Sequence, residues 1–154
     1  MELVLAIGKG GTQIPVKDAV DHIIAYGVGL DLTRRDAQAE AKQAGGPWDV
    51  AKALDHGAPM ATMLAANDGT LHPTETSKIW CRVNGQIRQE GTLDQMIWSN
   101  AEIIHHLSQR FALQPGDLIF TGTPAGVAPL QIGDVIEAGI DGLPELRLRL
   151  VGRV

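Results

Sequence analysis

Short apolar runs that end in turns rich in Gly, Pro or Thr constrain this sequence more than any other feature. Two stand out: GDLIFTGTPAGVAPL at residues 116–130 and GVGLDLTRRDAQ at residues 27–38. In each, an apolar strand leads into a loop that can present backbone amides, hydroxyls and a charged side chain from the end of a rigid element. The chain has eighteen Gly and eight Pro but only three Trp, two Phe and one Tyr. Because helical bundles carry fewer Gly and Pro, this composition favours a β-rich fold with a core of Val, Ile and Leu.

Length and charge narrow the class of protein. The 154 residues are 44% hydrophobic and 20% charged, which suffices for one globular domain with a sizeable core. A net charge of −5 argues against a nucleic-acid surface, since neutralising phosphates needs clustered Lys and Arg. The single cysteine, Cys81, rules out an internal disulfide and indicates a reducing compartment. No apolar run approaches the roughly 20 residues of a membrane span and no signal peptide opens the chain, so we expect a cytoplasmic protein.

The order of apolar and polar segments predicts an α+β, β-rich domain over residues 1–154, a rolled mixed β-sheet with a few outer helices. Asn84-Gly85 is the strongest hairpin signal. Thr33 is the expected cap of the second helix. The expected strands cover residues 2–7, 26–32, 61–64, 78–83, 86–89, 118–121, 135–138 and 145–151. The expected helices cover residues 15–24, 33–43 and 93–111.

Two carboxylates stand at strand ends: Glu2 opens the first strand and Asp31 closes the second. Burying either without a partner is costly, and a divalent cation is a natural partner. Ligands with oxygen alone favour Mg²⁺, Mn²⁺ or Ca²⁺ over Zn²⁺. On its own, Glu2 reads more readily as a surface acid at a strand end. The histidines are not expected to be ligands; they are His22, His56, His72, His105 and His106.

Together with GPWDVAKALDHGAP at residues 46–59, these segments resemble the catalytic domain of the fumarylacetoacetate hydrolase family. The resemblance runs from residue 2 to about residue 149. It is nearest to the small bacterial fumarylpyruvate (acylpyruvate) hydrolases, through MELVLAIGKGG, GLDLTRRD, PWDVAK and QMIWSNAEIIHHLS. The family likeness implies a rolled β-sheet fold and commonly a homodimer.

The resemblance also implies a ligand set for the metal. Family members carry an E-x-E pair followed by an Asp. Glu2 matches the second Glu of the pair, Met1 the intervening position and Asp31 the Asp. The first Glu, and an upstream stretch whose His and Glu activate the attacking water, would precede Met1. We therefore expect a truncated form of the family domain.

By the same resemblance, Lys52 stabilises the developing oxyanion or enolate, and Arg35 and Gln38 contact the substrate. Gly122 allows close approach of the backbone, and the hydroxyl or amide of Thr123 contacts the substrate. Read without the family, Lys52 is one surface lysine among many and the loop TGTPAGVAP is a tight turn.

The reaction implied is hydrolytic cleavage of a carbon–carbon bond in an acylpyruvate such as fumarylpyruvate, with Mg²⁺ or Mn²⁺ (or Ca²⁺) as the Lewis acid and an enolate as the leaving group. Two alternatives stay open. One is a metal-enolate lyase or isomerase, of the oxaloacetate decarboxylase or hydroxy-dienoate type. The other is an inactive truncated fragment that acts as a structural subunit. The expected partners are a small keto acid and a second copy of the chain, with no nucleic acid and no membrane.

Overall fold

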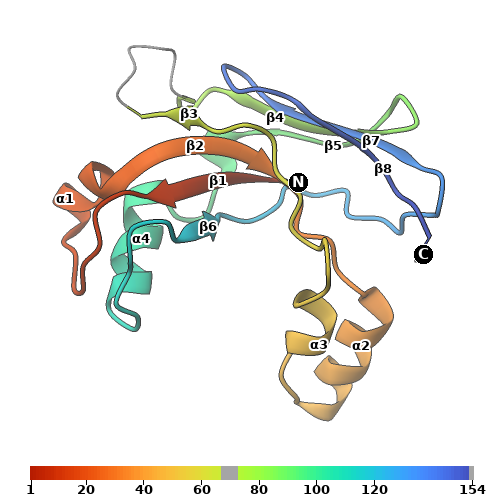
Figure 1. The fold of residues 1–154 in the computed structure, drawn as a ribbon, viewed down its shortest axis with the longest axis horizontal. Coiled ribbons are helices and arrows are strands. Elements are labelled where there is room, and N and C mark those ends of the chain that lie inside the picture. The colour runs from red at the N-terminus through yellow and green to blue at the C-terminus, as the bar shows by residue number, and fades with distance from the viewer. Residues whose placement is uncertain (67–72, 153–154) are drawn as a thin grey trace.

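Two four-stranded β-sheets form the body of the protein in a computed structural model that describes residues 1–66 and 73–152 (Figure 1). The first sheet has the order β3-β2-β1-β6 and the second has the order β5-β4-β7-β8, with every pairing between named strands antiparallel. The strands are β1 (Glu2–Ile7), β2 (Ile23–Gly29), β3 (Leu64–Ala65), β4 (Lys78–Val83), β5 (Gln86–Thr92), β6 (Leu118–Phe120), β7 (Val135–Ile140) and β8 (Leu146–Arg149). His72 lies outside the described residues.

The helices lie around the sheets (Figure 1). They are α1 (Val16–Ala19), the 3₁₀ turn η1 (Val20–His22), α2 (Arg35–Ala44), α3 (Asp49–Lys52), the 3₁₀ turn η2 (Leu93–Gln95) and α4 (Asn100–Ser108). Helices α1 and α4 pack together at one end of the first sheet, while α2 and α3 project from the body as an arm. This confirms the α+β class with outer helices. Within the described part of the chain, no helix has the length and apolar character that a membrane crossing requires.

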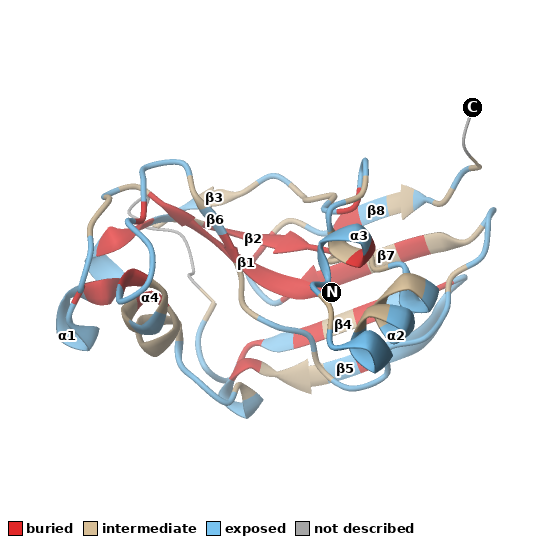
Figure 2. Cartoon of the chain, turned by 90° about the horizontal axis from the view of Figure 1, so that it is seen from below, coloured by how far each residue is buried: buried red, intermediate tan, exposed pale blue. Residues whose placement is uncertain are grey.

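Strand β1 is the centre of the core (Figure 2). All six of its residues are buried, because β2 and β6 flank it and apolar side chains cover both of its faces. Its Leu3 and Leu5 join Ile136 of β7 and Ile104 of α4 among the largest fully buried side chains. A run of apolar residues without alternation is what a strand covered on both faces requires. The N-terminal end of β1 and the C-terminal end of β2 therefore lie on a rigid part of the protein.

The helix predicted over residues 15–24 is wrong at its end. Helical geometry stops at His22, and Ile23 already belongs to β2, where it pairs with Ile7 of β1. The Ile24 side chain packs so closely on Gly8 that a Cβ there would lie 2.6 Å from it. Both isoleucines are β-branched, and tertiary pairing decides their conformation rather than helical spacing.

The long helix predicted over residues 93–111 is also wrong in extent. It is split into η2 and α4 by an extended stretch in which Met96 has φ −64° and ψ 137°. Ser99 begins α4 as its N-cap and forms a capping box with Glu102. Ser99 starts a new helix, and Ile97, with 96% of its surface exposed, lies outside the core.

Local turn chemistry explains the remaining boundaries. Asn84 and Gly85 have φ of 52° and 79°, as the predicted hairpin between β4 and β5 requires. Gly45, in the left-handed region, ends α2. Thr33 is not the cap: Arg34 is the N-cap residue of α2, and the Thr33 hydroxyl donates to the Asp31 carbonyl instead. The short strand predicted at residues 61–64 is found at β3, one to three residues later.

Candidate active site

Most of the predicted site residues meet in one place. A hollow of about 440 Å³ opens where β1 begins, where β2 ends and where the loop after β6 passes. Five of the predicted residues line it: Glu2, Asp31, Arg35, Lys52 and Thr123. Gln38 and Gly122 are not part of its wall. The sheets thus bring together side chains that lie up to about 120 positions apart in the chain.

Glu2 is buried, with only 6% of its surface exposed. Its Oε2 accepts a 2.8 Å hydrogen bond from the backbone N–H of Gly122. Burial raises the pKa of this carboxyl, and the nearby charge of Asp31 raises it too, while the bond from Gly122 works in the opposite direction. Ionised Glu2 is therefore costly in this position unless a cation approaches it.

Asp31 and Lys52 form an ion pair on the wall of the hollow. Asp31 follows β2, and Lys52 is the last residue of α3. The two segments are joined by backbone hydrogen bonds: Leu32 N–H donates to Gly57 O at 2.8 Å, and Arg34 N–H donates to Ala51 O at 3.0 Å. The arm therefore places an ammonium group directly on a strand-end carboxylate.

Arg35 and Gln38 lie one helical turn apart on α2. Arg35 Nη1 donates to Gln38 Oε1 at 2.9 Å, so the guanidinium is held at the near end of the arm. Asp31 does not belong to the helix that carries Arg35 and Gln38, because α2 begins only at Arg35. Arg35 nevertheless lines the same hollow as Asp31, whereas Gln38 does not.

The loop after β6 is fixed to β1. Thr121 binds the Leu3 carbonyl twice, through its N–H at 3.1 Å and through its hydroxyl at 3.0 Å. Gly122 has φ 106°, a conformation that favours glycine. That turn directs the Gly122 N–H at Glu2 and carries Thr123 to the hollow.

Among the other residues that line the hollow, none of them predicted, are Gln89 of β5, Cys81 of β4 and Met1. Gln89 and Cys81 are partners in the register of β4 and β5, and both are buried. Burial raises the pKa of the Cys81 thiol, which favours its neutral form. Polarity alone marks Gln89 as a solvent-facing residue, so only its position opposite an apolar Cys in the hairpin register could have indicated an inward side chain.

The donor set suits a hard divalent cation. Glu2 and Asp31 offer oxygen only, and each keeps one carboxylate oxygen for which the described residues show no partner. Within residues 1–66 and 73–152, no three His, Cys, Asp or Glu side chains gather closely enough to hold a metal ion by themselves. Two carboxylates would hold such an ion here, with its other positions open to water or substrate.

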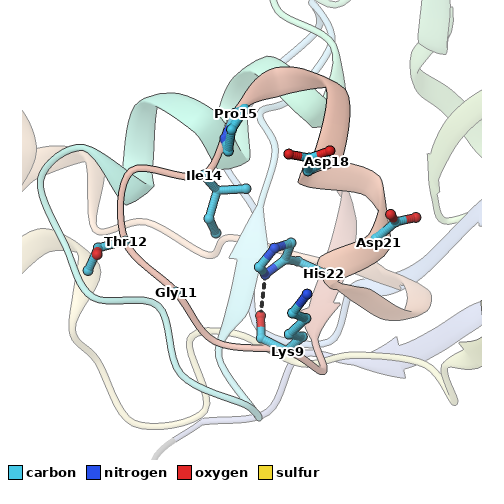
Figure 3. A pocket seen from close by; sticks show the side chains of 8 residues that line it. All are labelled: Lys9, Gly11, Thr12, Ile14, Pro15, Asp18, Asp21 and His22. Carbon is cyan, nitrogen blue, oxygen red and sulfur yellow. Dashed lines mark hydrogen bonds between the residues drawn. The ribbon is translucent and has the colours of Figure 1, made fainter.

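A second hollow of about 340 Å³ lies at the other end of the first sheet, beside α1 (Figure 3). It is lined by Lys9, Asp18, Asp21 and His22, among others. The buried His22 has its Nδ1 2.6 Å from the Lys9 carbonyl oxygen, which can only accept, so this nitrogen donates. None of the predicted site residues reaches this hollow.

Comparison with known proteins identifies the family of this chain. Residues 1–151 match the family described as Fumarylacetoacetate (FAA) hydrolase C-terminal. The chain is 43% identical over 148 residues to fumarylpyruvate hydrolase of Ralstonia sp., covering 96% of this chain and 76% of that protein. It is 39% identical over 150 residues to the mitochondrial oxaloacetate tautomerase of Mus musculus, covering 97% of this chain and 67% of the relative.

A solved structure, fumarylpyruvate hydrolase from Pseudomonas aeruginosa in complex with Mn²⁺ and pyruvate, superimposes with a TM-score of 0.94 at 45% identity. The match covers 99% of this chain and 64% of that one. The fold and these relatives thus define the class of protein as a metal-dependent enzyme domain. The chain belongs to the fumarylacetoacetate hydrolase family, and it spans about two thirds of the length of the mouse relative.

Proposed function

We propose that this chain carries the metal-enolate site of a hydrolase that cleaves a carbon–carbon bond in an acylpyruvate such as fumarylpyruvate. The observation that carries the proposal is the convergence of Glu2, Asp31, Lys52, Arg35 and Thr123 on one hollow. The cavity combines two carboxylates, an ammonium group, a guanidinium and a hydroxyl. A dicarbonyl acid presents two carbonyl oxygens and a carboxylate, which such a set of groups can bind.

Glu2 and Asp31 would hold the divalent cation, Mn²⁺ or Mg²⁺. When bound, that ion supplies Lewis-acid polarisation of the substrate's carbonyl oxygens. Lys52 and Thr123 stabilise negative charge as it develops on oxygen, since an ammonium and a hydroxyl can both donate to it. Arg35 orients the substrate carboxylate through its planar fork, with Gln38 holding the guanidinium in place.

Oxaloacetate tautomerisation is the second candidate. It needs only proton movements at an enolisable carbon and no activated water. Apart from Glu2, Asp31 and Lys52, the described walls of the hollow hold no carboxylate, amine or imidazole side chain to activate water. The mouse relative named above carries the tautomerase name. The same residues would serve both reactions. We also propose a cytoplasmic location and a homodimer.

The first test is Mn²⁺ binding by calorimetry to the chain and to Asp31→Asn. We expect the variant to lose at least about tenfold in affinity, because the number and charge of carboxylates set the affinity of hard cations. Asp36→Asn is the matched control, since Asp36 is an exposed acid of α2 outside the hollow. Equal affinity in all three proteins would refute the metal site.

The second test separates the candidate reactions. Acylpyruvate, oxaloacetate and a hydroxy-dienoate are incubated with the Mn²⁺-loaded protein, and products are followed by NMR. Cleavage of acylpyruvate to pyruvate and a carboxylic acid supports the hydrolase. Keto–enol exchange of oxaloacetate without acylpyruvate cleavage supports the tautomerase. Lys52→Met should abolish whichever reaction is found.

A further inference from the structure

Gln89 is a buried amide on the floor of the hollow, only 7% exposed. All of its polar atoms are engaged. Its Nε2 donates to Thr123 Oγ1 at 2.7 Å and to the Pro124 carbonyl at 2.8 Å. Its Oε1 accepts from the Met1 nitrogen at 2.9 Å. Gln89 thus ties the loop that carries Thr123 to strand β5.

The orientation of this amide follows from the chemistry of its partners. The Pro124 carbonyl oxygen can only accept a hydrogen bond, so the side-chain atom that faces it must be the nitrogen. The Met1 nitrogen donates and therefore faces the Gln89 oxygen. The two constraints agree, and a flipped amide would break both.

This orientation determines what the Thr123 hydroxyl can do. Its oxygen accepts from Gln89 Nε2 at 2.7 Å and from the Met1 nitrogen at 3.2 Å. A hydroxyl has two acceptor positions and one proton. With the acceptor positions filled by nitrogen donors, the proton remains to be donated, and no described residue accepts it. Thr123 is exposed and lines the hollow, so its O–H is available to an oxygen bound there.

The loop is also held at a second point. Gly126 lies against β5 so closely that a Cβ at this position would be 1.9 Å from the Arg88 carbonyl oxygen. Arg88 precedes Gln89, so two adjacent residues of β5 hold the loop: Arg88 through packing against Gly126, and Gln89 through its side-chain hydrogen bonds. The contact between Gln89 and Thr123 is therefore supported by packing as well as by hydrogen bonding.

We propose that Gln89 is a positioning residue that turns the Thr123 hydroxyl into a dedicated hydrogen-bond donor for an anionic oxygen of the keto-acid substrate. The inference rests on the proposed function, because it needs a substrate oxygen in the hollow. Gln89 itself does not touch the substrate; it acts through the threonine.

The test uses pyruvate as the probe, the ligand bound in the Pseudomonas aeruginosa relative. Pyruvate is titrated into Mn²⁺-saturated wild type, Gln89→Met, Thr123→Val and the double variant. Gln89→Met removes the donor at similar side-chain length, and Gln95→Met, at an exposed glutamine of η2, is the matched control. We expect about a tenfold loss of pyruvate affinity in each single variant, the cost of one hydrogen bond to a charged group.

The double variant should bind pyruvate no more weakly than Thr123→Val, because Gln89 acts through that hydroxyl. Mn²⁺ affinity should be equal throughout. Additive losses, or unchanged affinity in Gln89→Met, would overturn the inference. If the wild type binds neither Mn²⁺ nor pyruvate, both the proposed function and the positioning role of Gln89 are refuted. If the wild type binds both and Gln89→Met has the same pyruvate affinity, only the positioning role is refuted.

A ligand-free measurement keeps the inference testable in either case. The side-chain scalar couplings of Thr123 report whether one rotamer is held. We expect a single rotamer in wild type and Gln95→Met and rotamer averaging in Gln89→Met. Averaging in wild type would show that Gln89 does not orient this hydroxyl.

Discussion

The backbone N–H of Gly122 donates a 2.8 Å hydrogen bond to the carboxylate of Glu2, which lies 120 positions earlier in the chain. The bond joins the loop after β6 to the first residue of β1. It stabilises the ionised form of a carboxyl whose burial works against ionisation. The protein thus keeps at its centre an acid that is only partly compensated.

Glu2→Gln should stabilise the metal-free protein at neutral pH. Because burial raises the pKa of Glu2, the folded state binds more protons than the unfolded state. The stability that this provides is complete below the pKa of the unfolded chain and is lost as the pH rises through the folded pKa. The amide has no such loss and still accepts from Gly122. Thermal unfolding from pH 4 to pH 8 should show an advantage of the variant that grows with pH.

The control for that experiment is Glu40→Gln, at an exposed acid of α2. It should show no such pH-dependent gain. A Glu2→Gln protein that is less stable than wild type at every pH would contradict the interpretation.

Ile104→Ala should destabilise the protein by about 2–5 kcal/mol, because Ile104 is fully buried between α4 and the core and truncation leaves a cavity. Urea denaturation measures this as a lower midpoint with an unchanged slope. Ile97→Ala, at a side chain that is 96% exposed, should change stability by about 0.5 kcal/mol or less. Similar losses in both variants would mean that α4 does not pack as described.

Ser99→Ala should cost about 1 kcal/mol, because the Ser99 hydroxyl caps α4 through the N–H of Glu102. In return, Glu102 Oε2 accepts from the Ser99 N–H and hydroxyl at 2.8 Å, which holds the pKa of Glu102 below its usual range. Stability from this carboxylate is present above the unfolded-state pKa and is lost as the pH falls through the folded pKa. Ser99→Ala should therefore lose less stability on acidification than wild type. An identical acid dependence in both proteins would argue against the capping box.

Gly126→Ala should be more damaging than Gly133→Ala, although the two glycines have nearly the same φ, 98° and 100°. At Gly133 no atom lies within 4 Å of an added Cβ, so only backbone strain of about 1–3 kcal/mol applies. At Gly126 the Cβ would collide with the Arg88 carbonyl, and the loop would have to leave β5. Pyruvate affinity should fall in Gly126→Ala alone. Equal pyruvate affinity in both variants would mean that the Thr123 loop does not contribute to pyruvate binding.

Sequence patterning was sufficient where local chemistry decides structure. The apolar run of residues 2–7 and the Asn84-Gly85 turn predict β1 and the hairpin correctly. Helical spacing failed at Ile23 and at Ile97, because strand pairing and a new N-cap override it. These decisions depend on partners far away in the chain, which no local window contains.

Some residues of the candidate site could likewise be predicted from local sequence, and others could not. Glu2 and Asp31 stand at strand ends and attract notice as acids beside apolar runs. The placement of Lys52 on Asp31 rests on the backbone bonds that close the arm, so only family resemblance could indicate it. Gln89 escaped prediction because a polar residue in a short strand is expected to face water, whereas here it satisfies three polar groups inside.

The arm formed by α2 and α3 adds little to the core: α2 has no buried residue, and α3 has only Ala51. It joins the body through two adjacent segments held by bonds such as that from Leu30 N–H to Pro59 O. Substitutions along it can therefore accumulate without endangering the folding of the sheets. We therefore expect residues 33–57 to be exchangeable as a unit: a graft from a relative with a different reaction would replace the proposed substrate contacts, while Glu2, Asp31 and the Thr123 loop would stay on their original framework.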